Sequence, residues 1–234
     1  GSFLAIGVTG YLVEGLRMVW QQPTGIGAQC SPVGLLIAHA FSGLSNAGAR
    51  SLHWSLWWVH SLLVFGFIAS LPYTRLLHTL AGPLNLFFAR PELGRMTPIT
   101  MEEVEKTERV GVSAINHFNQ QQLLSLDACM ECGRCEEACP AHATDKPLSP
   151  KKVVQDLKRL MTLSLSPRTA DSSSPLPALH GDTIQAETLW SCTACSACVG
   201  VCPVRIDPLT FITDLRRNRV GEGTLSGTAA TALR

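Results

Sequence analysis

Three apolar stretches occupy the first third of the chain, and each predicts a helix. The strongest covers residues 52–71, which contain no Asp, Glu, Lys or Arg. At 1.5 Å per residue, about 20 residues span the roughly 30 Å hydrocarbon core of a bilayer. Trp54, Trp57 and Trp58 cluster near one end, as aromatic side chains do at a membrane interface. These features favour a transmembrane helix over the alternative, a helix buried in a soluble core.

The other two stretches are weaker, and we predict that they also cross the membrane because they neighbour the strongest one. Residues 3–20 are interrupted by Glu14 and Arg17, which lie three positions apart and could pair on one face of a helix. Residues 32–44 are short for a span and contain two glycines. A signal peptide is a poor alternative, because the first stretch has no basic leader and no cleavage pattern.

The arginines that flank residues 52–71 predict the orientation of the chain. Arg75, Arg90 and Arg95 follow this stretch, whereas Arg50 alone precedes it closely. Because basic residues are retained on the cytoplasmic side, the chain after residue 71 is predicted to lie in the cytoplasm. The expected location is therefore the inner (cytoplasmic) membrane, crossed several times, with the rest of the protein on the cytoplasmic side.

From residue 100 onward the pattern becomes that of a soluble helical protein. Apolar and charged positions predict helices over residues 101–126, 151–161 and 207–219. Residues 164–182 are rich in Ser and Pro and are predicted to form a loop. The predicted fold class is mainly α, with transmembrane helices followed by a cytoplasmic α-helical domain.

Composition agrees with this division. Charged residues make up 16% of the chain, below the about 25% of a typical soluble protein. The formal net charge is +1, which gives no reason to expect a nucleic acid as partner. Eight of the nine cysteines fall into two compact clusters, which is the spacing of metal ligands rather than of disulfides. The ninth, Cys30, stands alone and is expected to be incidental.

Two cysteine motifs carry the strongest chemical signal. They are Cys129-x2-Cys132-x2-Cys135-x3-Cys139-Pro140 and Cys192-x2-Cys195-x2-Cys198-x3-Cys202-Pro203. Three cysteines at this spacing can wrap a tight loop around an iron–sulfur cubane, with the fourth displaced onto the next turn. Zinc sites usually pair two Cys-x2-Cys knuckles and do not need three cysteines in one run. The motifs therefore favour two [4Fe–4S] clusters over zinc.

In two-cluster ferredoxins the last cysteine of each motif binds the other cluster. The first predicted ligand set is accordingly Cys129, Cys132, Cys135 and Cys202. The second predicted set is Cys192, Cys195, Cys198 and Cys139. This crossing would join the two halves and bring the clusters close enough for electron transfer. Clusters of this kind also point to a reducing compartment, in agreement with the predicted orientation.

Two histidines form a second candidate site. His60 and His78 are 18 residues apart, so an unbroken helix would place both on one face, about 27 Å apart. This arrangement suits two stacked haems b, each held by one histidine of this helix and one of another. Pro72 lies between them and is expected to kink such a helix, because it removes a hydrogen bond. The alternative is that each histidine only makes a hydrogen bond at the membrane interface.

The cysteine region resembles known families. Its motifs are separated by 52 residues, as in the longer iron–sulfur subunits of succinate dehydrogenase and heterodisulfide reductase. A plant-type [2Fe–2S] motif, typical of the former, is absent upstream, which favours the latter. The segments LDACMECGRCEEACPAHATDKPLSPKKVVQDL and LWSCTACSACVGVCPVRIDPLTFITDLRR resemble heterodisulfide-reductase-like membrane proteins. These include the membrane-bound electron-transfer-flavoprotein:quinone oxidoreductases, in which a membrane domain is fused to two ferredoxin-type clusters.

The segment around PYTRLLH and AGPLN resembles the last helix of the respiratory nitrate reductase gamma subunit, a dihaem cytochrome b. The resemblance implies that His60 and His78 are axial haem ligands. That family has more membrane helices than the three predicted here, including one that supplies the opposite ligands, for which His39 or His53 are weaker substitutes. The Cys-Cys-Gly repeats that usually follow the cluster domain are absent. We therefore expect the chain to be part of a longer polypeptide or of an assembly that completes it.

These predictions divide the chain into a cytochrome b-like membrane anchor, residues 1–95, and a two-cluster, ferredoxin-type domain similar to the iron–sulfur subunit of heterodisulfide reductase, residues 96–234. The expected function is an oxidoreductase subunit that passes electrons between a soluble flavoprotein or dehydrogenase and the quinone pool, through two [4Fe–4S] clusters and haem b. Other membrane or cluster-bearing subunits are expected partners, and no catalytic acid, base or nucleophile is identified. Two alternatives remain: a quinol-fed subunit of a heterodisulfide or sulfur-compound reductase, and a non-catalytic membrane anchor braced by its clusters.

Overall fold

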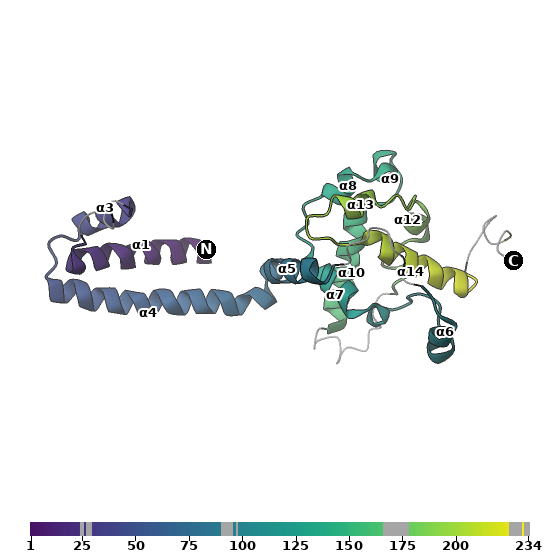
Figure 1. Ribbon diagram of the computed structural model, residues 1–234, viewed down its shortest axis with the longest axis horizontal. Helices are drawn as coiled ribbons and strands as arrows, with labels where there is room; N and C mark the ends of the chain where they lie inside the picture. Colours follow the sequence, from purple (N-terminus) through teal and green to yellow (C-terminus); the bar gives the residue numbers. More distant parts are fainter. Residues whose placement is uncertain are drawn as a thin grey trace. The chain divides into compact units, whose positions relative to one another are not determined.

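The computed structural model describes residues 1–23, 26, 30–89, 96, 98–165, 178–224 and 231. Within these ranges the regular structure is helical, apart from one isolated parallel bridge between His180 and Ile184, which confirms the mainly α fold class. The chain divides into two compact units, Gly1–Arg75 and Leu76–Arg234 (Figure 1). This division lies before the predicted boundary at residue 95, because helix α5 (His78–Phe88) packs on helix α7 (Gln120–Ala128).

The first unit contains the helices α1 (Ser2–Gln21), α3 (Pro32–Ala40) and α4 (Asn46–Ser70). α1 packs along α4 and also against α3. Gly15 of α1 allows a close approach to α3, because a Cβ atom at this position would lie 2.3 Å from Cγ2 of Ile37. Glu14 and Arg17 form the ion pair expected from their spacing, with Nη2 of Arg17 2.7 Å from Oε1 of Glu14. The ion pair neutralises the two charges within α1.

Two segments of this unit are long and apolar enough to cross a membrane, judged by length and composition: Ser2–Gln21 and Asn46–Tyr73. α3 has 9 residues, or about 14 Å, so it is too short to cross a bilayer alone, and the third predicted span is not confirmed. The side chains of Trp58, Leu62 and Phe65 on α4 are each at least 60% exposed within the unit. Apolar surface of this extent fits an interaction site or a lipid environment better than water.

In the described part of the second unit the longer helices are α5, α7, α10 (Pro150–Leu165) and α14 (Pro208–Gly221). Shorter helices connect them: α6 (Met101–Thr107), η3 (Ile115–His117), α8 (Arg134–Glu137), α9 (Pro140–Ala143), α12 (Ala186–Trp190) and α13 (Ala197–Gly200). α10 and α14 confirm the helices predicted over residues 151–161 and 207–219. Most of the predicted loop 164–182 lies outside the described residues.

The single helix predicted over residues 101–126 is wrong. The chain leaves α6 after Thr107 and passes through Glu108 (φ 53°) and Gly111 (φ 73°) before α7 begins. Only glycine fits at position 111, since a Cβ atom there would lie 2.4 Å from the backbone oxygen of Asp214 on α14. The amide of Val112 donates to the same oxygen at 3.1 Å. A contact with a helix far along the chain therefore interrupts the predicted helix.

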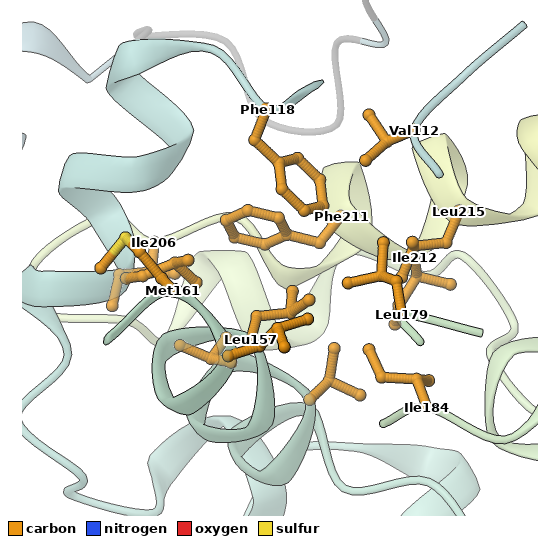
Figure 2. Packing of buried hydrophobic residues seen from close by; sticks show 14 of the residues in the cluster. Val112, Phe118, Leu157, Met161, Leu179, Ile184, Ile206, Phe211, Ile212 and Leu215 are labelled. Carbon is orange, nitrogen blue, oxygen red and sulfur yellow. The ribbon is translucent and has the colours of Figure 1, made fainter. Parts of the chain in front are cut away.

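The core of the second unit lies between α10 and α14 (Figure 2). The buried side chains of α10 recur at helical spacing and are Pro150, Val153, Val154, Leu157, Leu160 and Met161. From α14, Phe211, Ile212 and Leu215 are almost completely buried. Phe118 meets Phe211 edge to face, with ring centroids 5.2 Å apart. This core holds in place the two helices that follow the cysteine loops.

Candidate metal centre

The first cysteine loop begins where α7 ends. Cys129 is the C-cap of α7 and has an extended backbone, so the chain turns away from the helix at this residue. Glu131 and Gly133 adopt left-handed conformations, with φ of 58° and 84°. The four-residue helix α8 follows, and Cys139 comes directly before α9. The loop therefore folds back on itself twice between its first and third cysteines.

The second loop repeats this backbone. Ala194 (φ 56°) and Ser196 (φ 61°) stand at the same places relative to their cysteines as Glu131 and Gly133. α13 then takes the place of α8, and both helices have 4 residues. Left-handed residues between right-handed ones let successive backbone N–H groups converge into anion-binding concavities. Both loops therefore suit a negatively charged centre such as a thiolate-ligated cluster.

The eight motif cysteines line two cavities. The first cavity is bordered by Cys129, Cys132, Cys135 and Cys202. The second cavity is bordered by Cys139, Cys192, Cys195 and Cys198. Cys198 also borders the first cavity, so the two cavities are neighbours. The structure thus brings together the crossed sets that the ferredoxin spacing predicts.

The rest of each cavity wall is largely apolar. Val154, Val204 and Ile206 line the first cavity, and Leu209 and Ile212 line the second. Among the sulfur ligands, Cys139 is buried, whereas Cys132 and Cys195 are exposed. Each cavity therefore has one thiol on its solvent side, where a redox partner can approach most closely.

Two hydrogen bonds reach sulfur atoms of the first set. Nε2 of Gln155 on α10 lies 3.0 Å from Sγ of Cys129, and the backbone N of Ile206 lies 3.3 Å from Sγ of Cys202. Such N–H···S bonds stabilise negative charge on a cluster and are one of the ways in which a protein sets its potential. Gln155 could not be predicted from the sequence, because no spacing relative to the cysteines marks it.

Burial and charge repulsion raise the pKa of one or more thiols in each set. The pKa of Cys135 is raised to about 11, first by burial and then by the charges of the other three cysteines of its set. The pKa of Cys198 is raised to about 12, first by burial and then by Cys192 and Asp207. Thiolates that repel one another in this way need a positive centre between them, which iron supplies. The donor sets therefore fit iron–sulfur clusters.

The number of thiols in each cavity agrees with this fit. A [4Fe–4S] cluster takes four Cys thiolates, and each cavity offers four. Among the residues that the structure describes, no group of three or more His, Cys, Asp or Glu side chains is arranged to hold a single metal ion.

Arg216 of α14 holds the start of the second loop. Its Nη2 donates to the backbone oxygen of Cys192 at 2.6 Å, and its Nε donates to that of Leu189 at 2.9 Å. Its guanidinium carbon lies 5.0 Å from the ring centroid of Trp190, within the range of a cation–π contact. Arg216 thus places a positive charge beside the second set. This role of Arg216 could not be predicted from the sequence, because the residue resembles any charged position of a surface helix.

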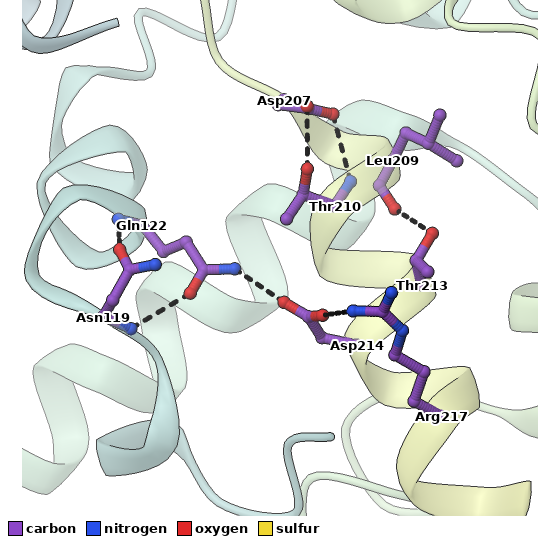
Figure 3. A network of polar contacts seen from close by, with 8 residues as sticks. All are labelled: Asn119, Gln122, Asp207, Leu209, Thr210, Thr213, Asp214 and Arg217. Carbon is purple, nitrogen blue, oxygen red and sulfur yellow. Dashed lines mark hydrogen bonds and ion pairs between the residues drawn. The ribbon is translucent and has the colours of Figure 1, made fainter. Parts of the chain in front are cut away.

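A polar network joins α7 to α14 (Figure 3). Nε2 of Gln122 donates to Oδ2 of Asp214 at 2.8 Å, and Nη1 of Arg217 lies 3.2 Å from Oδ1. Asn119 and Gln122 also form the capping box at the start of α7. Burial raises the pKa of Asp214. Because α7 leads into Cys129 and α14 follows Cys202, the network fixes both ends of the cysteine region.

The two candidate haem histidines do not share one helix. α4 ends at Ser70, and Pro72 lies in the first of two short 3₁₀ turns that precede α5. His78 is the first residue of α5, and His60 and His78 belong to different compact units. The unbroken helix considered for the haem geometry is therefore wrong. Pro72 lies at the break, as expected from its missing amide hydrogen.

His60 and His53 of α4 both face α1. Nδ1 of His60 lies 2.9 Å from Oγ1 of Thr9, and Nδ1 of His53 lies 3.0 Å from the backbone oxygen of Val13. Both contacts agree with the simpler role of a hydrogen-bonded histidine. The sequence of α1 contains no histidine, so this helix does not offer an opposite axial ligand for His60.

Comparison with known proteins places the cysteine region in a family. Residues 128–206 match the 4Fe-4S dicluster domain. Over 97% of its length the chain is 34% identical to EtfAB:quinone oxidoreductase of Syntrophomonas wolfei, and over 97% it is 32% identical to the probable iron-sulfur-binding oxidoreductase FadF of Bacillus subtilis. Over 75% it is 36% identical to a probable membrane-anchored ferredoxin of Chromohalobacter salexigens. No solved structure matches the chain.

The chain spans 36%, 36% and 30% of the lengths of these three relatives, or about a third. Over 55% of its length it is also 26% identical to a subunit of ferredoxin:CoB-CoM heterodisulfide reductase of Methanosarcina acetivorans, covering 44% of that protein. The relatives are iron–sulfur proteins of the oxidoreductase type, which supports a redox role. Residues 128–206, which hold all eight cavity cysteines, therefore belong to a 4Fe-4S dicluster domain.

Proposed function

We propose that this chain is the membrane-bound electron-transfer portion of an oxidoreductase. It passes electrons between a soluble flavoprotein or dehydrogenase and the quinone pool, through two [4Fe–4S] clusters and haem b. The observation that carries the proposal is the crossed grouping of eight cysteines into two neighbouring cavities. The similarity over 97% of the chain to EtfAB:quinone oxidoreductase supports the choice of partners.

The cysteines hold the clusters in this proposal. Cys129, Cys132, Cys135 and Cys202 are the ligands of the first, and Cys139, Cys192, Cys195 and Cys198 are those of the second. Each cluster supplies one-electron chemistry at a potential set by its surroundings. The apolar walls exclude water from the inner sulfurs, the bonds from Gln155 and the Ile206 amide stabilise negative charge, and the exposed Cys132 and Cys195 mark the sides that face partners.

Haem b has two candidate ligands in this proposal. His60 and His78 are the ligands that the resemblance to the nitrate reductase gamma subunit implies. His60 already bonds Thr9 through Nδ1, which leaves Nε2 for a metal. Because α1 has no histidine, the opposite ligand must come from another membrane segment. The proposal therefore requires further helices, either in the same polypeptide or in a partner subunit.

The membrane location rests on two apolar helices and on a relative named as a membrane-anchored ferredoxin. α1 and α4 are proposed to cross the inner membrane, and Arg75 beyond α4 favours the cytoplasmic side for the cluster domain. A second candidate function is a quinol-fed subunit of a heterodisulfide or sulfur-compound reductase. The relatives named as heterodisulfide reductase subunits favour it.

A redox titration of the purified membrane complex tests the proposal. Electron paramagnetic resonance and visible spectra are recorded under anaerobic conditions while the potential is lowered. We expect two [4Fe–4S] signals and a b-type spectrum, reducible by a flavoprotein or by a quinol. Reduction by quinol alone, with transfer to a disulfide, would select the second candidate. If neither the clusters nor the haem are reduced by any of these donors, the remaining interpretation is a non-catalytic membrane anchor.

A further inference from the structure

α5 differs from the other longer helices of the second unit, α7, α10 and α14, in its outward face. It contains no Asp, Glu, Lys or Arg, whereas each of the other three does. Leu80, Leu84, Phe87 and Phe88 recur at the spacing of one helical stripe, and their exposed fractions are 47%, 51%, 81% and 56%. A helix on the surface of a soluble domain normally carries polar residues on this side. The apolar stripe therefore faces something other than water.

The inward face of α5 is fixed to the wall of the first cavity. Asn85 is buried, and its Nδ2 donates to the backbone oxygen of Val204 at 2.7 Å. Gly82 allows the close approach, because a Cβ atom there would lie 3.3 Å from Cγ1 of Val204. Val204 lines the first cavity two residues after Cys202. α5 is therefore attached directly behind the last cysteine of the first set.

The chain itself limits how far α5 can lie from the membrane. α4 is long and apolar enough to cross a bilayer, and only residues 71–77 separate its end from the start of α5. Seven residues reach at most about 25 Å even when fully extended. A stripe of leucine and phenylalanine is the kind of apolar face that an interfacial helix buries at the lipid boundary, and the short tether to a membrane span keeps α5 within reach of that boundary.

We propose that the stripe of Leu80, Leu84, Phe87 and Phe88 rests in the lipid surface, and that α5 thereby turns the first cluster towards the membrane. The cluster held by Cys129, Cys132, Cys135 and Cys202 then exchanges electrons with the acceptor in the membrane, and the second exchanges them with the soluble partner. The lipid contact rests on the apolar stripe of α5 and on its short tether to α4, whereas the order of the clusters rests on the proposed function.

Spin labelling of the full chain in lipid nanodiscs tests the lipid contact. Leu84→Cys is labelled in a Cys30→Ser background, with clusters assembled and oxidised so that the ligand thiols are protected. Lys152→Cys is the matched control, because its side chain is 71% exposed on α10. We expect the label at position 84 to collide several-fold more with oxygen than with an aqueous nickel chelate, and the label at position 152 to show the reverse.

Two outcomes would overturn the lipid contact: a label at position 84 as open to the chelate as the control, or one shielded from both reagents by a protein segment. The order of the clusters is tested separately by rapid-freeze resonance spectra after addition of a quinol, in which the signal of the first cluster should appear before that of the second. Appearance of the second signal first, or of both together, would overturn the order. Collision data do not require reducible clusters, so the lipid contact can stand even where the proposed function fails.

Discussion

Arg216 donates a hydrogen bond to the backbone oxygen of Cys192, with Nη2 2.6 Å from that oxygen. This contact links α14 to Cys192, the first cysteine of the second loop, and places a positive charge beside it. A reduced cluster carries one more negative charge than an oxidised one, so a nearby cation stabilises the reduced form. Arg216 is therefore placed to raise the potential of the second cluster relative to the same site without the arginine.

Arg216→Gln should lower the potential of the second cluster by about 30 to 60 mV, where about 60 mV is a tenfold change for one electron. Arg216→Lys keeps the charge and should restore most of the shift, although it loses the two-pronged contact with the loop. A titration followed by electron paramagnetic resonance measures both potentials. A shift confined to the first cluster would contradict the assignment.

Iron and sulfide content tests the nature of the centre. Eight thiolates in two sets of four should hold about eight iron and eight acid-labile sulfide per chain. Metal analysis of anaerobically purified protein measures both. Stoichiometric zinc without labile sulfide would show that the loops are zinc sites instead.

The crossed ligation predicts that each last cysteine serves the cluster of the other motif. Cys139→Ala should alter the signal of the cluster bound by Cys192, Cys195 and Cys198. Cys202→Ala should alter the signal of the cluster bound by Cys129, Cys132 and Cys135. Mössbauer and resonance spectra of the two variants separate the effects. Cys30→Ala is the matched control and should change neither cluster, because Cys30 lies outside both cavities. If each variant altered only the cluster bound by the other three cysteines of its own motif, the crossed ligation would be refuted.

Haem ligation is tested by His60→Ala and His78→Ala. Each should remove one b-type signal in a pyridine haemochrome assay while the iron–sulfur content is kept. His142→Ala on α9, in the cluster domain, is a control that should leave the haem unchanged. If both histidine variants keep their full haem content, the hydrogen bond to Thr9 is the whole role of His60.

Gln122 contributes to stability through the network of α7 and α14. Gln122→Ala removes both a capping-box partner and the donor to the buried Asp214, and should cost about 1–3 kcal/mol, the range for a buried polar group left unpaired. Gln120→Ala, on the same helix and exposed, should stay within about 0.5 kcal/mol. Anaerobic thermal unfolding compares the two. Equal midpoints for both variants would mean that the network adds nothing.

The cysteine site could be predicted because its chemistry is local. Spacing alone pointed to the eight cysteines that line the two cavities, and a general rule of ferredoxins predicts the crossed grouping in which they lie; their ligation of clusters stays a prediction. The contacts that tune the site could not be predicted, because Gln155 and Arg216 reach it from helices whose sequences carry no marker. The left-handed backbone of Glu131 and Ala194 could not be predicted either, since neither residue is a glycine.

Helices could be predicted where the spacing of their own apolar residues is enough to define them. α10 and α14 follow from the spacing of their buried residues. The helix over residues 101–126 failed because its interruption depends on Gly111 meeting Asp214, a tertiary contact that no local pattern records. Pro72 predicted a kink between His60 and His78. The sequence did not predict that the helix ends there and that His78 begins a new helix, α5.

The crossing of the last cysteines has a consequence for how this domain can be divided. A cut anywhere between residues 140 and 191 would leave one piece with Cys129, Cys132, Cys135 and Cys139, and the other with the remaining four. Each piece would keep four thiols, but neither would contain all four cysteines of one cavity, because each cavity takes its fourth cysteine from the other motif. With crossed ligation the two centres are thus assembled and lost as a pair, and the segment between the motifs also belongs to the site, because Val154 and Gln155 of α10 contact the first set.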